Sequence, residues 1–321
     1  MHRFEKWVRL TSLAVGMMAS SLPVLAAKVD SVKLMQSREA VSVQVTDLSP
    51  RFLDFHGAAA GLDGETRWAL WQERYGFAAI PPTPEGMAIA RRLLDEAWNR
   101  YPEAMPAIRA GAAGMKPSPL DILLEVTRLF DWHDPVRVDV VAFVGGFEAN
   151  AFTAARNGIA MVAIPLEIDG GQRDLLLLHE MTHAAQIAMG VMSGGWEREV
   201  GVTVLTEGLA CMTVKQLRPG RKDEDYVAHR PGWYDEAMAK APAILRGIRG
   251  ALSDKDSDSV FRFTMGTGTT GTEREAYIAG WLVVNRLLAD GWTFPRLARV
   301  PEAEMSALVA ATIDMILADT N

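Results

Sequence analysis

The sequence predicts an α+β protein that is mostly helical, with a small β-sheet in the middle of the chain. Apolar residues recur at helical spacing through most of the 321 residues, 49% of which are hydrophobic. Two apolar runs at 136–144 and 159–164 instead have the short, β-branched character of strands. Because helical patterns lie on both sides of these runs, the order favours α+β over an alternating parallel α/β sheet.

The elements follow in order along the chain. The segment 41–46 alternates between apolar and polar residues, as a half-buried strand does. Helical patterns that open on Pro, Asp, Ser or Thr follow at about 64–75, 84–99 and 118–131. After the two middle strands, with turns at Gly145-Gly146 and 156–158, five more helices are expected at about 173–189, 202–217, 234–252, 274–290 and 301–318.

Residues 1–26 read as a signal peptide. Three basic residues precede an apolar run from Leu10 to Leu25, and small residues follow it, with cleavage expected after Ala26 or Ala27. An uncleaved membrane anchor is the alternative, but the run is short for a bilayer span. We expect an exported protein, periplasmic in a bacterium, with no stable membrane anchor after cleavage.

The remaining residues, 27–321, are expected to form a single unit with three parts. A helical part is expected at about 50–135, a part with the sheet and two apolar helices at about 136–217, and a helical part at 218–321. No repeat and no flexible linker interrupts them. The Gly- and Thr-rich segment 263–272 lacks the Gly-Lys-Ser/Thr of a phosphate loop and is expected to be mobile.

The charge and the cysteine content exclude several functions. The formal net charge is −7, whereas a dedicated nucleic-acid binder needs clustered Lys and Arg for phosphate contacts. A single cysteine, Cys211, excludes an internal disulfide and any all-cysteine zinc cluster.

The pentad His179-Glu-Met-Thr-His183 carries the candidate chemistry. It lies in an apolar helical pattern without Pro or Gly, and residues four apart on a helix share one face. Both imidazoles can therefore reach one metal ion. Glu180 is rotated by about 100° from His179, where its carboxylate can act as general base on water.

A third metal ligand is expected on the next apolar helix, 202–211, which carries one carboxylate, Glu207. A Gly-rich reversal separates this helix from the pentad, so two antiparallel helices would bring Glu207 against His179 and His183. Two histidines and one glutamate leave a fourth position open, as in catalytic zinc sites. We therefore expect one Zn²⁺ per chain.

These motifs resemble a known family. His-Glu-x-x-His followed by Thr206-Glu-Gly-Leu-Ala210 is similar to the gluzincin zinc metallopeptidases, and to a group of bacterial predicted zinc-dependent proteases. The resemblance implies a thermolysin-like catalytic core, zinc ligands His179, His183 and Glu207, and Glu180 as general base. It also implies hydrolysis of a peptide or protein substrate by a metal-activated water.

The resemblance leaves several residues open. Cys211 stands where thermolysin-type enzymes often have an Asp that orients a ligand His, so Glu167 and Asp169 are alternative candidates for that role. The segment 277–285 is similar to a late Tyr-x-x-Gly helix of the bacterial group. Tyr277 and His229 are both candidates to stabilise the oxyanion, and Tyr277 is preferred.

A short segment before the second middle strand resembles a substrate-binding strand. Asn150-Ala151-Phe152 is similar to the Asn-Ala segment on the edge strand with which thermolysin pairs its substrate.

Two other functions are compatible with the same residues. The protein could be a non-catalytic periplasmic zinc-binding or assembly factor, because ligands alone fix binding but not turnover. It could also be a zinc hydrolase of a non-peptide amide or ester.

Overall fold

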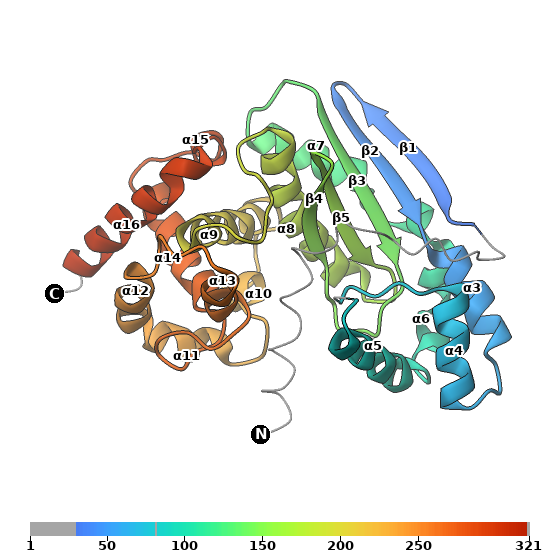
Figure 1. Ribbon diagram of the computed structural model, residues 1–321. Coiled ribbons are helices and arrows are strands. Elements are labelled where there is room, and N and C mark those ends of the chain that lie inside the picture. Colours follow the sequence, from blue (N-terminus) through green and yellow to red (C-terminus); the bar gives the residue numbers. More distant parts are fainter. Residues whose placement is uncertain (1–29, 81, 320–321) are drawn as a thin grey trace. The chain divides into compact units, whose positions relative to one another are not determined.

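Figure 1 shows the computed structural model of the chain, which describes residues 30–80 and 82–319. These residues form two compact units. The sheet unit comprises 30–80, 82–124 and 133–184, and the helical unit comprises 125–132 and 185–319. The predicted signal peptide lies outside the described residues. Among the helices of 30–80 and 82–319, none combines the length and the apolarity needed to cross a membrane.

The sheet unit is built on one five-stranded mixed sheet, which confirms the predicted α+β class. Its strand order is β1-β2-β3-β5-β4, with β2, β3 and β5 parallel and the outer strands antiparallel to their neighbours. The strands are β1 (Val32–Arg38), β2 (Val41–Asp47), β3 (Val136–Phe143), β4 (Phe152–Arg156) and β5 (Ile159–Pro165).

The sequence had predicted a sheet confined to the middle of the chain. The observed sheet also includes two strands from the N-terminal part. β1 and β2 form an antiparallel hairpin from the N-terminal part, and β2 then pairs in parallel with β3 (Figure 1). At the other edge, β4 and β5 form a hairpin whose turn residues Asn157 and Gly158 both have positive φ. An Asn-Gly pair favours this turn, so the predicted turn at 156–158 is confirmed.

Two helices of the sheet unit, α4 and α5, begin at side-chain caps that the sequence had indicated. The Asp63 carboxylate accepts a hydrogen bond from Thr66 N at the start of α4, and the Thr83 hydroxyl accepts one from Gly86 N at the start of α5. The helices are α3 (Ser49–Ala58), α4 (Gly64–Arg74), α5 (Pro84–Ala97), α6 (Tyr101–Ala110), the 3-10 helix η1 (Ala112–Gly114), α7 (Pro119–Leu129) and α8 (Gly170–Ala188).

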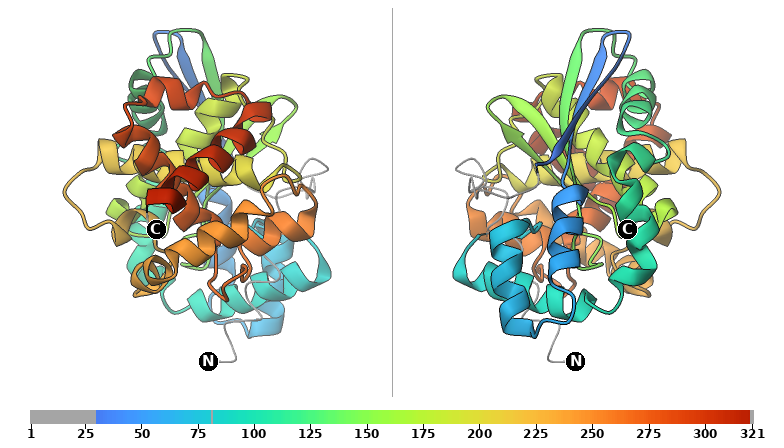
Figure 2. Two further views of the ribbon diagram at one scale, coloured as in Figure 1. Left: turned by 90° about the vertical axis from the view of Figure 1, so that its left-hand side faces the viewer. Right: turned by 90° about the vertical axis from the view of Figure 1, so that its right-hand side faces the viewer.

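Four of these helices gather at the C-terminal ends of β2 and β3 (Figures 1 and 2). They are joined by an aromatic cluster, in which the Phe52 ring lies 4.8 Å from Tyr101 and 5.4 Å from Tyr75, edge to face. Phe52 and Phe55 are fully buried. The four helices, α3 to α6, therefore have an apolar core of their own.

The helical unit is centred on two helices, α9 (Val200–Leu217) and α14 (Glu275–Ala289), which pack against each other. Every residue of α9 from Val200 to Val214 is buried. The helix α16 (Glu302–Asp319) lies against α9, α12 and α14 (Figure 2, left). The others are α10 (Glu224–Val227), α11 (Trp233–Ala239), α12 (Ala241–Arg249), α13 (Ser257–Thr264) and α15 (Phe294–Ala298).

The prediction of one helix at 234–252 is wrong, because two helices occupy this range. α11 ends at Ala239 and α12 begins at Ala241, with Lys240 between them outside the helical region at φ −107° and ψ 7°. Pro242, in the first turn of α12, has no N–H to continue an earlier helix, so the chain breaks just before it.

Candidate metal centre

The two histidines of the pentad lie one turn apart on α8, with His183 buried and His179 half-buried. Their rings are 4.9 Å apart between centroids, and the two Nε2 atoms are 3.2 Å apart. Tetrahedral zinc with Zn–N bonds of about 2.0–2.1 Å needs ligand nitrogens about 3.4 Å apart. The two imidazoles therefore already present their nitrogens at the spacing of a metal-bound pair.

Glu207 on α9 completes a group of three ligand-type side chains. One ligand atom each from His179, His183 and Glu207 lies within 4.8 Å of the others. His183 and Glu207 are each 7% exposed, so both side chains are largely shielded from solvent. The group could hold a metal ion, and its two nitrogens and one oxygen are the donor set of a catalytic zinc site.

Glu180 is held by a residue that the sequence analysis missed. The Thr153 hydroxyl lies 2.7 Å from Glu180 Oε2 and 2.9 Å from the Glu180 carbonyl oxygen. Thr153 belongs to the edge strand β4, so this contact ties the carboxylate of the pentad to the sheet. A strand as short as β4 gives little sequence signal, and nothing in the sequence pairs Thr153 with Glu180.

The sequence also did not indicate two arginines near Glu207, which are Arg198 and Arg274. Burial alone would lower the pKa of Arg274, but its contacts with Tyr277 and the charge of Glu207 raise it overall. Burial lowers the pKa of Arg198, and the charge of Glu207 opposes this shift. Arg198 is fixed by bonds from Nε to Thr203 Oγ1 at 3.0 Å and from Nη1 to Gly195 O at 2.9 Å. Both arginines therefore lie within electrostatic range of the Glu207 carboxylate.

Tyr277 lies in the first turn of α14 and is half-buried. The Arg274 guanidinium carbon is 4.0 Å from the centre of the Tyr277 ring, a cation–π contact. Arg274 adopts a left-handed backbone conformation with φ 55°. Such a conformation is costly outside glycine and has no sequence signature, which is why the arginine could not be predicted here.

Gly208 and Gly280, the glycines of the two motifs that resemble the bacterial group, pack against each other. A Cβ added at Gly208, in the Glu-Gly-Leu-Ala segment of α9, would overlap the backbone of Gly280 on α14. A Cβ added at Gly280 would in turn lie 2.8 Å from Gly208 N. Both motifs therefore have a packing reason for their glycine: it lets the helix with Glu207 approach the helix with Tyr277 closely.

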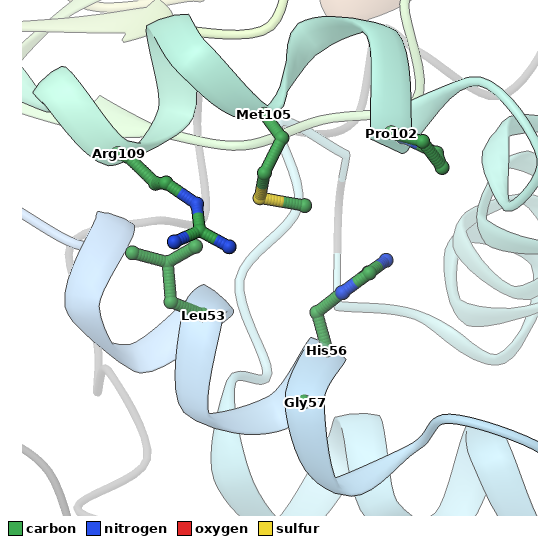
Figure 3. A pocket seen from close by; sticks show the side chains of 6 residues that line it. All are labelled: Leu53, His56, Gly57, Pro102, Met105 and Arg109. Atoms are coloured by element: carbon green, nitrogen blue, oxygen red, sulfur yellow. The ribbon is translucent and has the colours of Figure 1, made fainter.

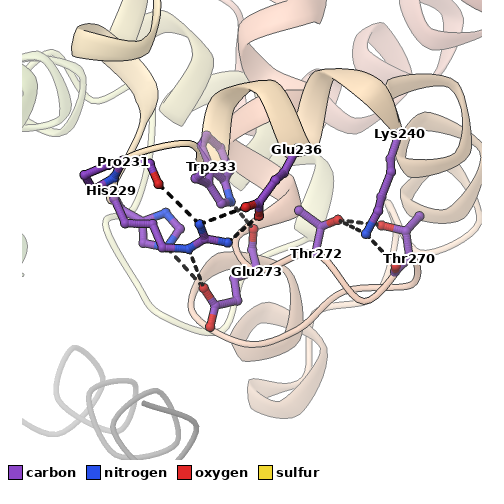
Figure 4. Close-up of polar contacts among 9 residues, drawn as sticks. His229, Pro231, Trp233, Glu236, Lys240, Thr270, Thr272 and Glu273 are labelled. Carbon is purple, nitrogen blue, oxygen red and sulfur yellow. Dashed lines mark hydrogen bonds and ion pairs between the residues drawn. The ribbon is translucent and has the colours of Figure 1, made fainter. Parts of the chain in front are cut away.

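His229, the other oxyanion candidate, is tied to a carboxylate of its own unit (Figure 4). Its Nε2 lies 3.2 Å from Glu273 Oε2, and the Glu273 carbonyl accepts a bond from Trp233 Nε1 at 2.9 Å. Burial, and next the charge of Arg274, lower the pKa of His229 to about 4, so its imidazole is neutral at pH 7. These contacts give His229 a role in holding the loop after α10, which leaves Tyr277 as the preferred candidate.

The two candidates for orienting a ligand histidine point elsewhere. The exposed Asp169 carboxylate accepts bonds from Gly171 N and Gln172 N at the start of α8. The buried Glu167 carboxylate accepts bonds from Gly145 N at 2.9 Å and Phe147 N at 3.2 Å. Both carboxylates therefore organise backbone, and their suggested role beside a ligand is not supported.

Glu167 makes the stability of the protein pH-dependent. Burial raises its pKa to about 7, above the ordinary value of 4.5. Its contribution to the free energy of unfolding is therefore complete below pH 4.5 and is lost as the pH rises through 7, a change of up to about 3 kcal/mol. We expect Glu167→Gln to remove this loss. The free energy of unfolding, measured with urea, should then fall less between pH 5 and pH 8 than it does in the parent chain.

The dependence of stability on pH distinguishes the titration of Glu167 from the loss of a hydrogen-bond acceptor. The amide of Glu167→Gln has one acceptor oxygen for two backbone donors, so the variant is expected to be less stable at pH 5. Asp169→Asn, which removes the charge of an exposed carboxylate, is the control. An unchanged difference between the two pH values in Glu167→Gln would contradict the prediction.

The segment similar to a substrate-binding strand leads into β4, at the edge of the sheet. Asn150 donates a bond from Nδ2 to Ala79 O at 2.6 Å, and Phe152 begins the strand. Among the described strands, β4 pairs with β5 on one side, which leaves its other edge for an added strand.

The Gly- and Thr-rich segment 263–272 is anchored by a buried carboxylate. Glu275 is 0% exposed and accepts bonds from the backbone N–H groups of Thr269 and Thr270, at 2.9 and 2.8 Å, and from both their hydroxyls. A Cβ at Gly268 would overlap the Glu275 side chain. The loop is therefore wrapped around Glu275, a partner that the sequence analysis did not identify.

No protein-family description matches the chain, and no curated protein matches it.

Proposed function

We propose that the protein is an exported zinc-dependent peptidase of the gluzincin type. The observation that carries this proposal is the approach of one ligand atom each from His179, His183 and Glu207 to within 4.8 Å, with Glu180 in the same helical turn as His179. Two imidazoles and one carboxylate leave an open position in a tetrahedral site, which suits catalysis better than a structural role.

The metal would be held by His179 Nε2, His183 Nε2 and a Glu207 carboxylate oxygen. A bound zinc ion supplies Lewis-acid chemistry, because it polarises the scissile carbonyl and lowers the pKa of the attacking water. The Glu207 carboxylate also interacts electrostatically with Arg198 and Arg274.

Glu180 acts as the general base in this proposal. Its carboxylate accepts a proton from the attacking water and passes it to the leaving amine, and the Thr153 hydroxyl holds the carboxylate in one orientation. The Tyr277 hydroxyl donates a hydrogen bond to the carbonyl oxygen as negative charge develops there, with Arg274 against its ring.

The edge of β4 is the proposed substrate-binding element. An extended peptide can add to an exposed sheet edge through main-chain hydrogen bonds, with its side chains alternating between two faces. β4 carries Thr153, so a peptide bound along this strand would lie beside the residue that contacts Glu180. This supports a peptide substrate over a small amide or ester.

Metal removal tests the proposal. We expect the purified chain without residues 1–26 to contain about one zinc ion and to cleave members of an unbiased peptide library. Exhaustive chelation should abolish cleavage, and added Zn²⁺ should restore it, because the ligands remain after the metal is lost. Mass spectrometry of the library and metal analysis of the protein are the two measurements.

Three outcomes would contradict the proposal in different ways. Cleavage that survives chelation would exclude metal chemistry. Stoichiometric zinc without cleavage of any peptide or ester would favour a non-catalytic binding or assembly factor. Cleavage of esters or non-peptide amides alone would favour the other hydrolase class.

A further inference from the structure

A cavity of about 520 Å³ lies between α3 and α6 of the sheet unit, outside the residues of the candidate metal centre (Figure 3). This volume is in the range of small-molecule sites. Its lining residues are Leu53, His56, Gly57, Pro102, Met105 and Arg109.

The cavity offers apolar surface to a ligand body. Leu53 and Met105 face each other from the two helices, and Pro102 closes one side (Figure 3). Gly57 has no side chain, and a Cβ added there would meet nothing within 4 Å, so this part of the wall is open. Methionine is an adaptable side chain that suits apolar ligands of variable shape.

Two nitrogen-bearing side chains point into this apolar space. Arg109 extends from the last turn of α6 toward α3, and His56 extends from α3 toward α6 (Figure 3). Within residues 30–80 and 82–319, Arg109 makes no hydrogen bond or ion pair with another side chain or with backbone. Its guanidinium is therefore available to an anion.

The His56 ring is held in place by aromatic neighbours. It lies 4.8 Å from the Trp98 ring and 5.8 Å from the Phe52 ring, between centroids. Burial, and next the charge of Arg109, lower its pKa, so the imidazole is neutral at pH 7 and offers one N–H. The cavity thus contains one permanent positive charge, one neutral donor and an apolar wall.

We propose that this cavity binds a small monocarboxylate with a short apolar body, its carboxylate against Arg109 and its body against Leu53 and Met105. A single guanidinium matches a single negative charge, and its planar donors fit the two oxygens of a carboxylate. A doubly charged phosphate would leave one charge uncompensated on a chain whose net charge is −7. The ligand is either a free aliphatic acid or the C-terminal residue of a peptide.

The test is a titration of the protein with small ligands, observed by NMR at the Met105 methyl and the His56 ring. The probes are hexanoate for an aliphatic acid, N-acetyl-leucine for a peptide terminus, and inorganic phosphate and hexylamine as comparisons. We expect one or both carboxylates to shift the two signals with a Kd of about 1 mM. Phosphate and hexylamine should bind at least about tenfold more weakly.

Two variants locate the site. Arg109→Gln should weaken carboxylate binding by about tenfold or more, because it removes the charge and retains the helix. Arg246→Gln is the matched control, because Arg246 is an exposed arginine in the last turn of α12, and it should leave binding unchanged. Gly57→Leu should abolish binding by filling the open wall; circular dichroism checks that each variant is folded.

The outcomes decide between the possibilities. Signal shifts with one carboxylate alone would identify the aliphatic acid or the peptide terminus as the ligand class. No shift with either carboxylate at about 20 mM, or equal affinity in Arg109→Gln and the parent chain, would overturn the proposal. Equal binding of hexylamine would show that apolar contact alone fills the cavity, which also overturns it.

Discussion

Glu180→Gln is expected to lower peptide turnover by about 10³-fold or more while the chain keeps its metal. The amide cannot accept a proton from water, but it has nearly the same size as the carboxylate. Its oxygen can still accept the bond from the Thr153 hydroxyl, so the local structure should not change. The loss should appear in kcat, since the general base acts on the reaction and not on substrate binding.

The measurement pairs kinetics with metal analysis in a small set of variants. Glu73→Gln, on the exposed face of α4, is the matched control and should have the activity and metal content of the parent chain. His183→Ala should lose the metal itself, because it removes one of three ligands. Equal turnover in Glu180→Gln and the parent chain would show that Glu180 is not the base, whichever metal is bound.

The candidate site could be predicted where its chemistry is local in sequence. His179 and His183 share a helical face through their spacing of four, and Glu207 is the one carboxylate of the next apolar helix. Thr153 and Arg274 could not be predicted, because they depend on the pairing of β4 with β5 and on a left-handed residue before α14. The sequence therefore indicates the candidate ligands, and the fold is needed to find the residues around them.

The fold could be predicted where amphipathic pattern and helix caps agree. The helices at 64–75 and 84–99 begin at Asp63 and Thr83 caps, and the structure confirms both to within two residues. The strand β1 was missed because its residues are mostly exposed and show no alternation of apolar and polar residues. The helix α6 was missed because Pro106 lies inside it, where helix patterns are normally interrupted.

Gly208→Ala is expected to destabilise the protein by about 3 kcal/mol or more, a fall in Tm of about 6–12 °C. The added methyl group would overlap the backbone of Gly280, and backbone atoms cannot turn aside as a flexible side chain can. Since α9 is buried from Val200 to Val214, relief requires α9 and α14 to separate. Gly280→Ala should have a similar effect, because its Cβ would overlap Val204 O on the facing helix.

A glycine without neighbours supplies the control for this prediction. A Cβ at Gly57, near the end of α3, meets nothing within 4 Å, so Gly57→Ala should raise stability by about 0.5–1 kcal/mol. Thermal unfolding with and without a chelator is the measurement. Gly208→Ala should also lose most of the stabilisation by zinc, because the separation of α9 and α14 displaces the neighbouring Glu207. A Tm within about 1 °C of the parent chain would mean that the two helices approach less closely than the structure gives.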